Sequence, residues 1–493
     1  MKISIDKSSK VPVYLQIADQ IKAQIISGAL PRLSALPSER ALAQILDVHR
    51  NTVVKAYGEL KSDAWIESRQ GVGYLVASAS TEKEPVGESG EGVQMGRVNW
   101  VNEVADKYLD MEKTFDDLFQ RFTDESHFSL GSGIASREVY SSERVAHDIA
   151  GLLTGSGPSQ YFFSPYKGDR FLRQKLASFL GTKGVKASSG EIQILSETNQ
   201  ALDFIVTLLV KPGDSVVMEE PVHPDMYRVM ELAGARILTV PVDEDGMNCD
   251  VLESLLTQTR PRLIFVNSSF HDPTGCILSL ERRKKLVELS SRYRIPIVEE
   301  DAASELVYDG DKLPPIKAFD TTGNVIYIYS FSLTFIPGLS LAFVTGNRDF
   351  VRALSYLVSV RLMASDWMTQ KLLGMYLDDG SYYSSLATFR EIYSGNRDLV
   401  CQKLDALAHL GVRYERPRGG VYVWCRLPDG VDSKHFINRA YNMGVTLIPG
   451  HVFYPYKNGG RDYIRINYSY ESRERLARGM DVLHKALEEE LEE

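Results

Sequence analysis

The first part of the chain shows helical spacing of apolar residues, followed by two short β-rich runs. Apolar residues recur every three to four positions over residues 11–26, which predicts a helix. Ser38 is a suitable N-cap for a second helix over residues 39–46, and a third helix begins near Arg50. Two β-rich runs within residues 65–76 surround a glycine-containing tip. Residues 1–77 are therefore predicted to form three helices and a β-hairpin.

A different pattern begins at about residue 128, where short β-rich runs alternate with helical patterns. Such runs occupy residues 215–218, 263–266, 296–299 and 325–328. The alternation predicts an α/β domain with a mostly parallel sheet and helices on its faces. From about residue 383, a long helix and strands around residues 420–424 and 463–467 predict a smaller α+β lobe.

The stretch between the two parts differs from both in composition. Residues 78–103 are polar and rich in glycine, and they contain almost no large apolar residue. A segment of this kind is expected to be a flexible linker. The predicted domains are therefore residues 1–77, the linker at 78–103, and residues 104–493.

Composition narrows the class of protein. The 493 residues contain no apolar stretch near the roughly 20 residues of a membrane span, so no membrane association is expected. The N-terminus lacks the charged and then apolar pattern of a secretory signal. The four cysteines are widely scattered, which argues against a disulfide framework or a metal site and favours a cytoplasmic location.

Charge is distributed unevenly along the chain. Residues 1–77 carry ten Lys and Arg against seven Asp and Glu, a net charge of +3, whereas the whole chain has a net charge of −9. An excess of this size would not by itself indicate a nucleic-acid partner. The positive charge becomes informative because it falls on the predicted pattern of two helices, a turn, a third helix and a hairpin.

That pattern is a winged helix-turn-helix. The runs at residues 36–40 and 50–52, together with the hairpin glycines, resemble the DNA-binding domain of the GntR family over about 70 residues. In this architecture the third helix enters the major groove of double-stranded operator DNA. Each arginine alone would be an ordinary solvated charge, but together they match the family's positions. The resemblance implies these DNA contacts: Arg40, Arg50, Thr52, Arg69 and Gly71.

The second part resembles fold-type I pyridoxal-phosphate-dependent aminotransferases over roughly residues 128–488. The motifs that carry this resemblance occur in order at residues 166–173, 199–202, 272–275, 330–334, 337–339 and 418–420, and end with Arg465. Combined with the winged helix, the chain resembles a MocR-type regulator, the GntR subfamily with an aminotransferase-like effector domain. The resemblance implies pyridoxal phosphate as the cofactor and a homodimer formed through this domain.

One position departs from the chemistry of that family. In the run at residues 330–334, Leu333 occupies the position of the lysine that forms the Schiff base with the cofactor. A leucine cannot form an imine, and the nearest lysines along the chain, Lys317 and Lys371, lie outside the motif. No covalent attachment of pyridoxal phosphate is therefore expected, and its retention is in question.

Further replacements fall on the contacts of the same cofactor. Ser340 matches the arginine that grips the phosphate, and Glu197 matches a glycine of the phosphate turn. Glu300 matches the aspartate that pairs with the pyridinium nitrogen, unless Asp301 takes that role through a shift in register. His223 matches the tyrosine that stacks on the ring, and it either stacks or caps the following turn.

The carboxylate side of the pocket is also altered. Arg465 fits the position that grips a substrate carboxylate, and a salt bridge at the rim of the site is the alternative role. Asp272 replaces an asparagine, which disfavours an anion and favours an amine-bearing ligand. The degenerate pocket is expected to comprise Thr198, Asn199, His223, Asp272, Glu300, Ser330, Ser332, Leu333, Ser340 and Arg465.

Two functions remain open at this point. The first is a transcriptional regulator whose aminotransferase-like domain senses a small molecule, such as an amino acid or a carboxylate, and serves as a dimerisation scaffold. The second is a pyridoxal-phosphate-dependent aminotransferase, or a non-covalent binder of the cofactor, that carries a DNA-binding arm. Leu333 favours the first function.

Overall fold

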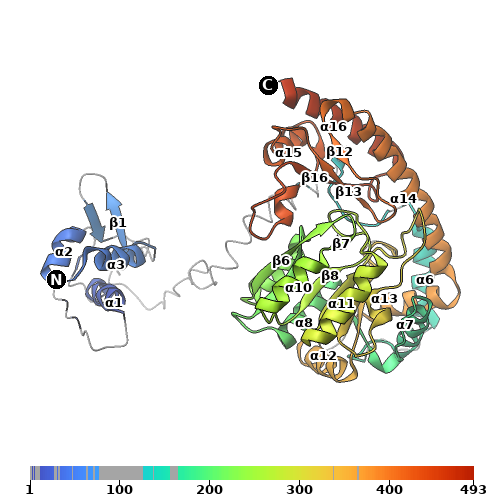
Figure 1. Ribbon diagram of the computed structural model, residues 1–493, viewed down its shortest axis with the longest axis horizontal. Coiled ribbons are helices and arrows are strands. Elements are labelled where there is room, and N and C mark those ends of the chain that lie inside the picture. The colour runs from blue at the N-terminus through green and yellow to red at the C-terminus, as the bar shows by residue number, and fades with distance from the viewer. Residues whose placement is uncertain are drawn as a thin grey trace, which may run out of the picture. The chain divides into compact units, whose positions relative to one another are not determined.

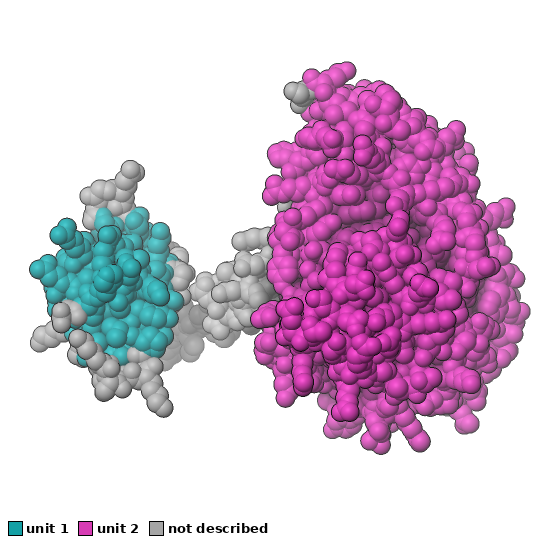
Figure 2. Space-filling view, viewed as in Figure 1, with its two compact units in different colours: residues 1–98 teal, residues 99–493 magenta. Residues whose placement is uncertain are grey.

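The computed structural model divides the chain into two units, Met1–Val98 and Asn99–Glu493 (Figure 2). The structure describes residues 3, 5, 12–26, 30–31, 34–46, 48–62, 65–69, 73–76, 121, 126–136, 138–155, 165–336, 338–362 and 366–492. The predicted linker at residues 78–103 and the predicted DNA contact Gly71 lie outside these residues.

The first unit contains three helices and a hairpin, as the sequence predicted. Its elements are α1 (Val13–Ile26), α2 (Glu39–Leu46), α3 (Arg50–Ser62), β1 (Ile66–Arg69) and β2 (Gly73–Val76), with the two strands antiparallel. Ser38 caps α2, because its Oγ accepts a hydrogen bond from the Ala41 N–H at 3.2 Å. The apolar faces of the helices meet in one buried core that includes Ile17, Ile21, Leu42, Val53, Ala56, Tyr57 and Leu60.

The second unit is built on an eight-stranded sheet with the order β4-β11-β10-β9-β8-β5-β6-β7 (Figure 1). The strands are β4 (Ile192–Leu195), β5 (Ser215–Glu220), β6 (Arg236–Asp243), β7 (Gly246–Met247), β8 (Ile264–Asn267), β9 (Ile297–Asp301), β10 (Val325–Ser330) and β11 (Ala342–Thr345). β11 and β7 run antiparallel to their neighbours, and the central strands are parallel. The predicted, mostly parallel α/β sheet is confirmed.

Helices cover both faces of this sheet, and the alternation of side chains along each strand explains why. In β5, Val216 and Met218 pack with α8 (Thr198–Leu209) and α9 (Pro224–Leu232) on one face. The intervening Val217 packs on the other face with α10 (Cys249–Gln258) and α11 (Leu280–Tyr293). The remaining helices of this domain are α6 (Ser142–Gly155), α7 (Arg170–Thr182), α12 (Arg348–Arg361) and α13 (Trp367–Asp378).

A smaller lobe follows the long helix α14 (Ser381–Asp405). It contains an antiparallel sheet with the order β12-β13-β16-β15 and two further helices. Its elements are β12 (Arg413–Tyr414), β13 (Tyr422–Arg426), α15 (Ser433–Asn442), β14 (Val445–Thr446), β15 (Ile448–Pro449), β16 (Tyr463–Asn467) and α16 (Arg473–Glu492). Figure 1 shows α14 and α16 running beside each other along this lobe. No described helix is long and apolar enough to cross a membrane.

The lobe also includes a segment from the start of the second unit. β3 (Phe128–Ser129) pairs in parallel with β14, and Asn467 N–H donates to the carbonyl of Leu130 at 2.7 Å. The small lobe is thus assembled from both ends of the unit, whereas the sequence indicated only the segment after about residue 383.

A buried cluster of charges lies where the loop after β9 meets α7. Lys183, which is fully buried, donates to Ser304 Oγ at 2.6 Å, and its Nζ lies 2.7 Å from Glu305 Oε1. The same Nζ lies 3.7 Å from Asp301 Oδ2, and Asp301 is also fully buried. Lys183 therefore compensates two carboxylates that water does not reach.

We predict that Lys183→Met lowers the free energy of unfolding by about 3–5 kcal/mol, since it leaves the buried Asp301 carboxylate without a cation, whereas Glu305 keeps its pairs with Lys312 and Arg390. Lys175→Met is the matched control, because Lys175 lies in α7, the helix that Lys183 follows as C-cap, and pairs with Asp378 at the surface. Loss of a surface pair should cost less than about 1 kcal/mol. Urea unfolding would measure both changes, and equal effects in the two variants would contradict the assignment.

Candidate ligand pocket and DNA-binding surface

A cavity of about 160 Å³ lies at the carboxyl ends of the parallel strands. Ligands of open α/β sheets bind at this edge, because the loops that follow the strands converge there. Asp272 follows β8, Glu300 lies in β9, and Leu333 follows β10. The lining comprises Gly133, Thr198, Val222, His223, Met226, Phe265, Asn267, Phe270, Asp272, Glu300, Ala302, Ala303, Ser332, Leu333 and Tyr422.

Six of the ten pocket residues expected from the sequence line this cavity: Thr198, His223, Asp272, Glu300, Ser332 and Leu333. The other four do not. Asn199 donates to Asp225 Oδ2 at 3.2 Å, and Ser330 donates to Ser332 Oγ at 3.1 Å. Ser340 lies in the loop before β11 and is exposed to solvent. Arg465 does not line the cavity itself but donates to Asp272, which does.

Leu333 contributes to an apolar wall. Its side chain is buried, and apolar residues from four other segments line the same cavity: Val222, Met226, Phe265, Phe270 and Ala303. No lysine lines the cavity among the residues that the structure describes. Sequence reasoning did not identify these apolar residues, because buried strand ends and loops have the same composition as the core.

Strand alternation decides between Glu300 and Asp301. Glu300 faces the cavity, whereas Asp301 points to the opposite side of the sheet, where Lys183, Ser304 and Tyr327 bind it. The two residues are adjacent in β9, so their side chains must face opposite ways. The alternative register, with Asp301 at the pocket, is therefore excluded.

Glu300 is held in an environment that favours its neutral form. Burial and, to a smaller extent, the neighbouring carboxylate of Asp301 together raise its pKa to about 8. The Asn267 side chain, which lies opposite Glu300 in the β8–β9 register, donates to Glu300 Oε2. Asn267 was missed by sequence reasoning, although its position as the last residue of a parallel strand is a usable signal.

Arg465 and Asp272 form a nearly closed ion pair. Arg465 Nη1 lies 2.7 Å from both oxygens of Asp272, and Nη2 donates to the carbonyl of Gly131 at 2.9 Å. The guanidinium carbon stacks 4.2 Å above the ring centre of Tyr422 and 5.2 Å from that of Phe453. The Arg465 side chain is only 3% exposed. The arginine that the resemblance assigns to a substrate carboxylate is thus occupied by a carboxylate of the chain itself.

His223 takes the capping role that the sequence left open, and it also lines the cavity. Its Nδ1 accepts a hydrogen bond from the Asp225 N–H at 3.3 Å, at the N-terminus of α9. Its Nε2 lies 3.8 Å from Asp272 Oδ2. The imidazole therefore extends the Asp272–Arg465 pair toward the cavity.

The helix terminus expected to cradle a phosphate is unfavourable to an anion. Glu197 is the N-cap residue of α8, and its side chain is exposed and makes no capping hydrogen bond. The preceding Ser196 N–H donates to Gln200 Oε1 at 2.9 Å, so that donor is already satisfied. A carboxylate at the helix N-terminus opposes the binding of a second negative group there.

The first unit presents a different candidate surface. Arg50 begins α3, its side chain is 65% exposed, and it pairs with Glu39 Oε2 at 3.0 Å. Arg40 is exposed in α2, and Thr52 is half-buried in α3. Arg69 ends β1, where it pairs with Gly73 across the hairpin. The exposed ion pair between Arg50 and Glu39 stabilises the fold by at most about 1 kcal/mol, so Arg50 is available to another anion.

Two exposed apolar residues accompany these side chains. Ile45 in α2 is 69% exposed, and Val54 in α3 is 39% exposed. Val54 lies one helical turn after Arg50, so both are on the same face of α3. Sequence reasoning missed Val54, although its helical spacing from Arg50 was a sufficient signal. Apolar groups on a recognition helix can contact the methyl groups of thymine.

Comparison with known proteins agrees with the architecture of both units. Residues 126–483 match the family of class I and II aminotransferases, and residues 13–76 match the GntR family of bacterial regulatory proteins. The crystal structure of LysN, an α-aminoadipate aminotransferase from Thermus thermophilus, superposes with a TM-score of 0.73 and 28% identity. It covers 80% of this chain and 99% of that chain, and it was solved with N-(5'-phosphopyridoxyl)-L-leucine.

Two regulators are similar over almost their whole length. YdfD of Bacillus subtilis, named as an uncharacterized HTH-type transcriptional regulator, is 28% identical over 481 residues, which is 96% of each chain. The probable rhizopine catabolism regulatory protein MocR of Rhizobium meliloti is 28% identical over 458 residues, covering 90% of this chain and 88% of that protein.

The fold and the cavity define an aminotransferase-like protein with an N-terminal winged helix-turn-helix. The chain belongs to the class I and II aminotransferase family, and its GntR-type domain gives it the domain order of MocR-type regulators. Proteins of the aminotransferase family are typically dimeric and are associated with pyridoxal phosphate.

We predict that Glu300→Gln becomes more stable relative to the wild type as the pH rises. The wild-type carboxyl is neutral in the folded protein up to about pH 8 but ionises near pH 4.3 when unfolded. Wild-type stability therefore falls between these pH values, and the glutamine variant lacks that loss. The difference in unfolding free energy between pH 5 and pH 8.5 should reach at least about 1.4 kcal/mol, the equivalent of one pKa unit.

Urea unfolding at the two pH values would measure this difference. Glu143→Gln, at an exposed position in α6, is the control and should show no such trend. A pH-independent difference for Glu300→Gln would contradict a neutral Glu300.

Proposed function

We propose that this protein is a DNA-binding transcriptional regulator whose aminotransferase-like unit is a dimerisation scaffold and a non-covalent sensor of a small molecule. The observation that carries this proposal is the apolar Leu333 wall in a cavity lined by no described lysine. Leu333 stands where the resemblance places the Schiff-base lysine, so the covalent step of the enzyme family has no residue to perform it. DNA binding by the winged helix-turn-helix is then the activity of the protein.

The residues around the cavity do not fit pyridoxal phosphate. Glu197 places a negative charge where the resemblance expects the phosphate, and Ser340 supplies no cation there. Glu300 replaces the expected aspartate, and the burial that raises its pKa to about 8 makes it a weaker partner for a pyridinium nitrogen. The volume of about 160 Å³ is also below the roughly 300–1,000 Å³ typical of sites for drug-sized ligands. Pyridoxal phosphate retained after dialysis would contradict this part of the proposal.

The Asp272–Arg465 pair points to an amino acid as the effector. A simple carboxylate on Arg465 would leave Asp272 as an unpaired negative charge in a mostly buried site, which is costly. A zwitterion offers a carboxylate to Arg465 and an ammonium group to Asp272 and His223. It can replace both halves of the pair without leaving a charge uncompensated.

We also propose that two chains associate through the aminotransferase-like units. A symmetric dimer would carry two winged helices, and these suit two half-sites of double-stranded operator DNA. Binding of an effector that prefers one arrangement of the dimer would shift its population and thereby its DNA affinity.

The DNA-binding part is tested by Arg50→Ala. We predict that it weakens binding to a duplex that the wild type has selected from a random-sequence pool by roughly 5- to 150-fold, or about 1–3 kcal/mol. Arg352→Ala, at an arginine whose side chain is 80% exposed in the second unit, is the control and should bind as the wild type does. Absence of any selected duplex, or equal loss in both variants, would contradict DNA recognition through α3.

The sensor part is tested by Asp272→Asn, which leaves Arg465 without its partner carboxylate. We predict that amino acids, but not simple carboxylates such as acetate or succinate, raise the melting temperature of the wild type. In the variant the preference should reverse in favour of simple carboxylates, because Arg465 is then free and the ammonium contact is lost. An Asp272→Asn, Arg465→Met double variant should respond to neither class.

A further inference from the structure

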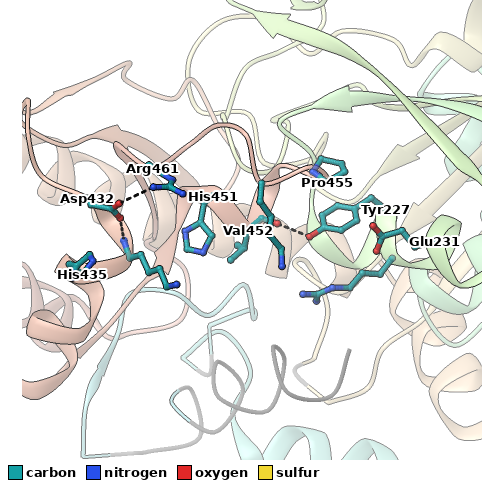
Figure 3. A pocket seen from close by; sticks show the side chains of 11 residues that line it. Tyr227, Glu231, Asp432, His435, His451, Val452, Pro455 and Arg461 are labelled. Carbon is teal, nitrogen blue, oxygen red and sulfur yellow. Dashed lines mark hydrogen bonds and ion pairs between the residues drawn. The ribbon is translucent and has the colours of Figure 1, made fainter. Parts of the chain in front are cut away.

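A second cavity, of about 650 Å³, lies between α9 of the large domain and the small lobe. Figure 3 shows His435, His451 and Arg461 on one side of it and Tyr227 and Glu231 on the other. The lining comprises Tyr227, Arg228, Glu231, Asp432, Lys434, His435, His451, Val452, Pro455, Lys457 and Arg461. It shares no described residue with the cavity at Leu333.

The charge of this lining is opposite in sign to that of the whole chain. Four side chains that are cationic at neutral pH line the cavity, namely Arg228, Lys434, Lys457 and Arg461. The lining contains two carboxylates, Glu231 and Asp432, so it carries an excess of about two positive charges in a protein of net charge −9; outside the lining, Asp225 lies 4.0 Å from Arg228.

The carboxylates leave part of that positive charge uncompensated. Asp432 Oδ2 lies 3.9 Å from Arg461 Nη1, at the edge of ion-pair distance. In the parts of the chain that the structure describes, no carboxylate lies within 4 Å of the Nζ of Lys434 or Lys457. Both lysines are exposed to the solvent of the cavity, so an anion can reach them.

His451 adds a polar group without a partner. It belongs to the 3₁₀ turn Gly450–Phe453, and its Nδ1 is buried with no hydrogen-bond partner among the described residues. Burial lowers its pKa, and nearby cations, Lys434 first among them, lower it further. The imidazole therefore experiences the positive potential of the cavity, which it helps to line.

The walls of the cavity are fixed across the boundary of the two lobes. The Tyr227 hydroxyl, on α9, donates to the carbonyl of Val452 in the small lobe at 3.0 Å, and both residues are buried. Nearby, the Val222 N–H donates to the carbonyl of Phe453 at 2.8 Å. The cavity is therefore a structured cleft with defined walls, and its volume lies within the range of small-molecule sites.

We propose that this cleft binds a small molecule bearing a phosphate group. A phosphate monoester carries a charge of about −1.5 to −2 at neutral pH, which matches the excess charge of the lining. Its oxygens diverge, so that they can meet lysine ammonium groups and an arginine from different walls at the same time. The phosphates of DNA share this chemistry, but a cleft of about 650 Å³ has the size of a small-molecule site and does not accommodate a DNA duplex.

The test is a calorimetric titration of the full-length protein with inorganic phosphate and, separately, with pyrophosphate, both at constant ionic strength. We expect saturable binding by the wild type and at least a tenfold loss of affinity in the Lys434→Ala, Lys457→Ala double variant. The Lys211→Ala, Lys485→Ala double variant removes the same charge at exposed positions elsewhere and should bind as the wild type does. Lys434→Glu, which reverses the charge, should abolish binding.

Each other outcome would overturn the proposal. Binding that does not saturate, or an equal loss of phosphate affinity in the control variant, would show only general charge screening and no specific site. Binding that Lys434→Glu leaves intact would place the phosphate elsewhere, for instance near α8. If the cleft bound duplex DNA but neither phosphate nor pyrophosphate, it would be part of the DNA-binding surface and not a small-molecule site. The outcome is separate from the proposed regulator function, because operator binding by the Arg50 and Arg352 variants is measured independently.

Discussion

The Asp272–Arg465 ion pair is the interaction on which the pocket depends. It joins the loop after β8 of the large domain to β16 of the small lobe, and Arg465 extends it to the backbone of Gly131. Aromatic rings of Tyr422 and Phe453 shield the guanidinium, so the pair is held in a low-dielectric environment where breaking it is costly. A pocket built on such a pair has no net attraction for a simple anion, and it is shaped before any ligand arrives.

The same edge of the sheet carries several other carboxylates, and the protein compensates each one differently. Asp301 is bound by Lys183, Ser304 and Tyr327 on the far face. Glu299 accepts hydrogen bonds from Ser268 and from two backbone N–H groups. Glu219 and Glu300 have no cation at ion-pair distance among the described residues, and burial raises the pKa of each to about 8. These compensations explain how so acidic an edge remains folded.

Sequence patterns were sufficient for the elements but not for their long-range contacts. The winged helix and strands β5, β8, β9 and β10 lie where apolar spacing predicted them, because burial on one or two faces is a local property of the sequence. β3 and β14 were not foreseen, since two short strands that pair over more than 300 residues leave no local pattern. The roles of Asp272 and Arg465 were open because their pairing depends on how two lobes pack.

The second cleft was beyond sequence reasoning for a related reason. Arg228, Lys434 and Lys457 belong to three separate segments, and only the packing of α9 against the small lobe brings them together. Local charge counts do not detect this cleft, because its cations come from segments that are far apart in the sequence. Sequence reasoning therefore identified the pocket that resembles an enzyme and overlooked the one that does not.

Both cavities lie at the boundary between the large domain and the small lobe, and this position gives them a common physical consequence. Asp272–Arg465 crosses the boundary beside one cavity, and Tyr227–Val452 crosses it beside the other. A ligand that separates Asp272 from Arg465 changes the free energy of the arrangement of the large domain and the small lobe. A ligand that draws together the walls of the second cleft changes the free energy of that same arrangement. Two ligands that favour one arrangement would then strengthen each other's binding by an equal factor, as thermodynamic linkage requires. If both proposed ligands bind, the two cavities would be coupled through the lobe arrangement alone, with no covalent step needed.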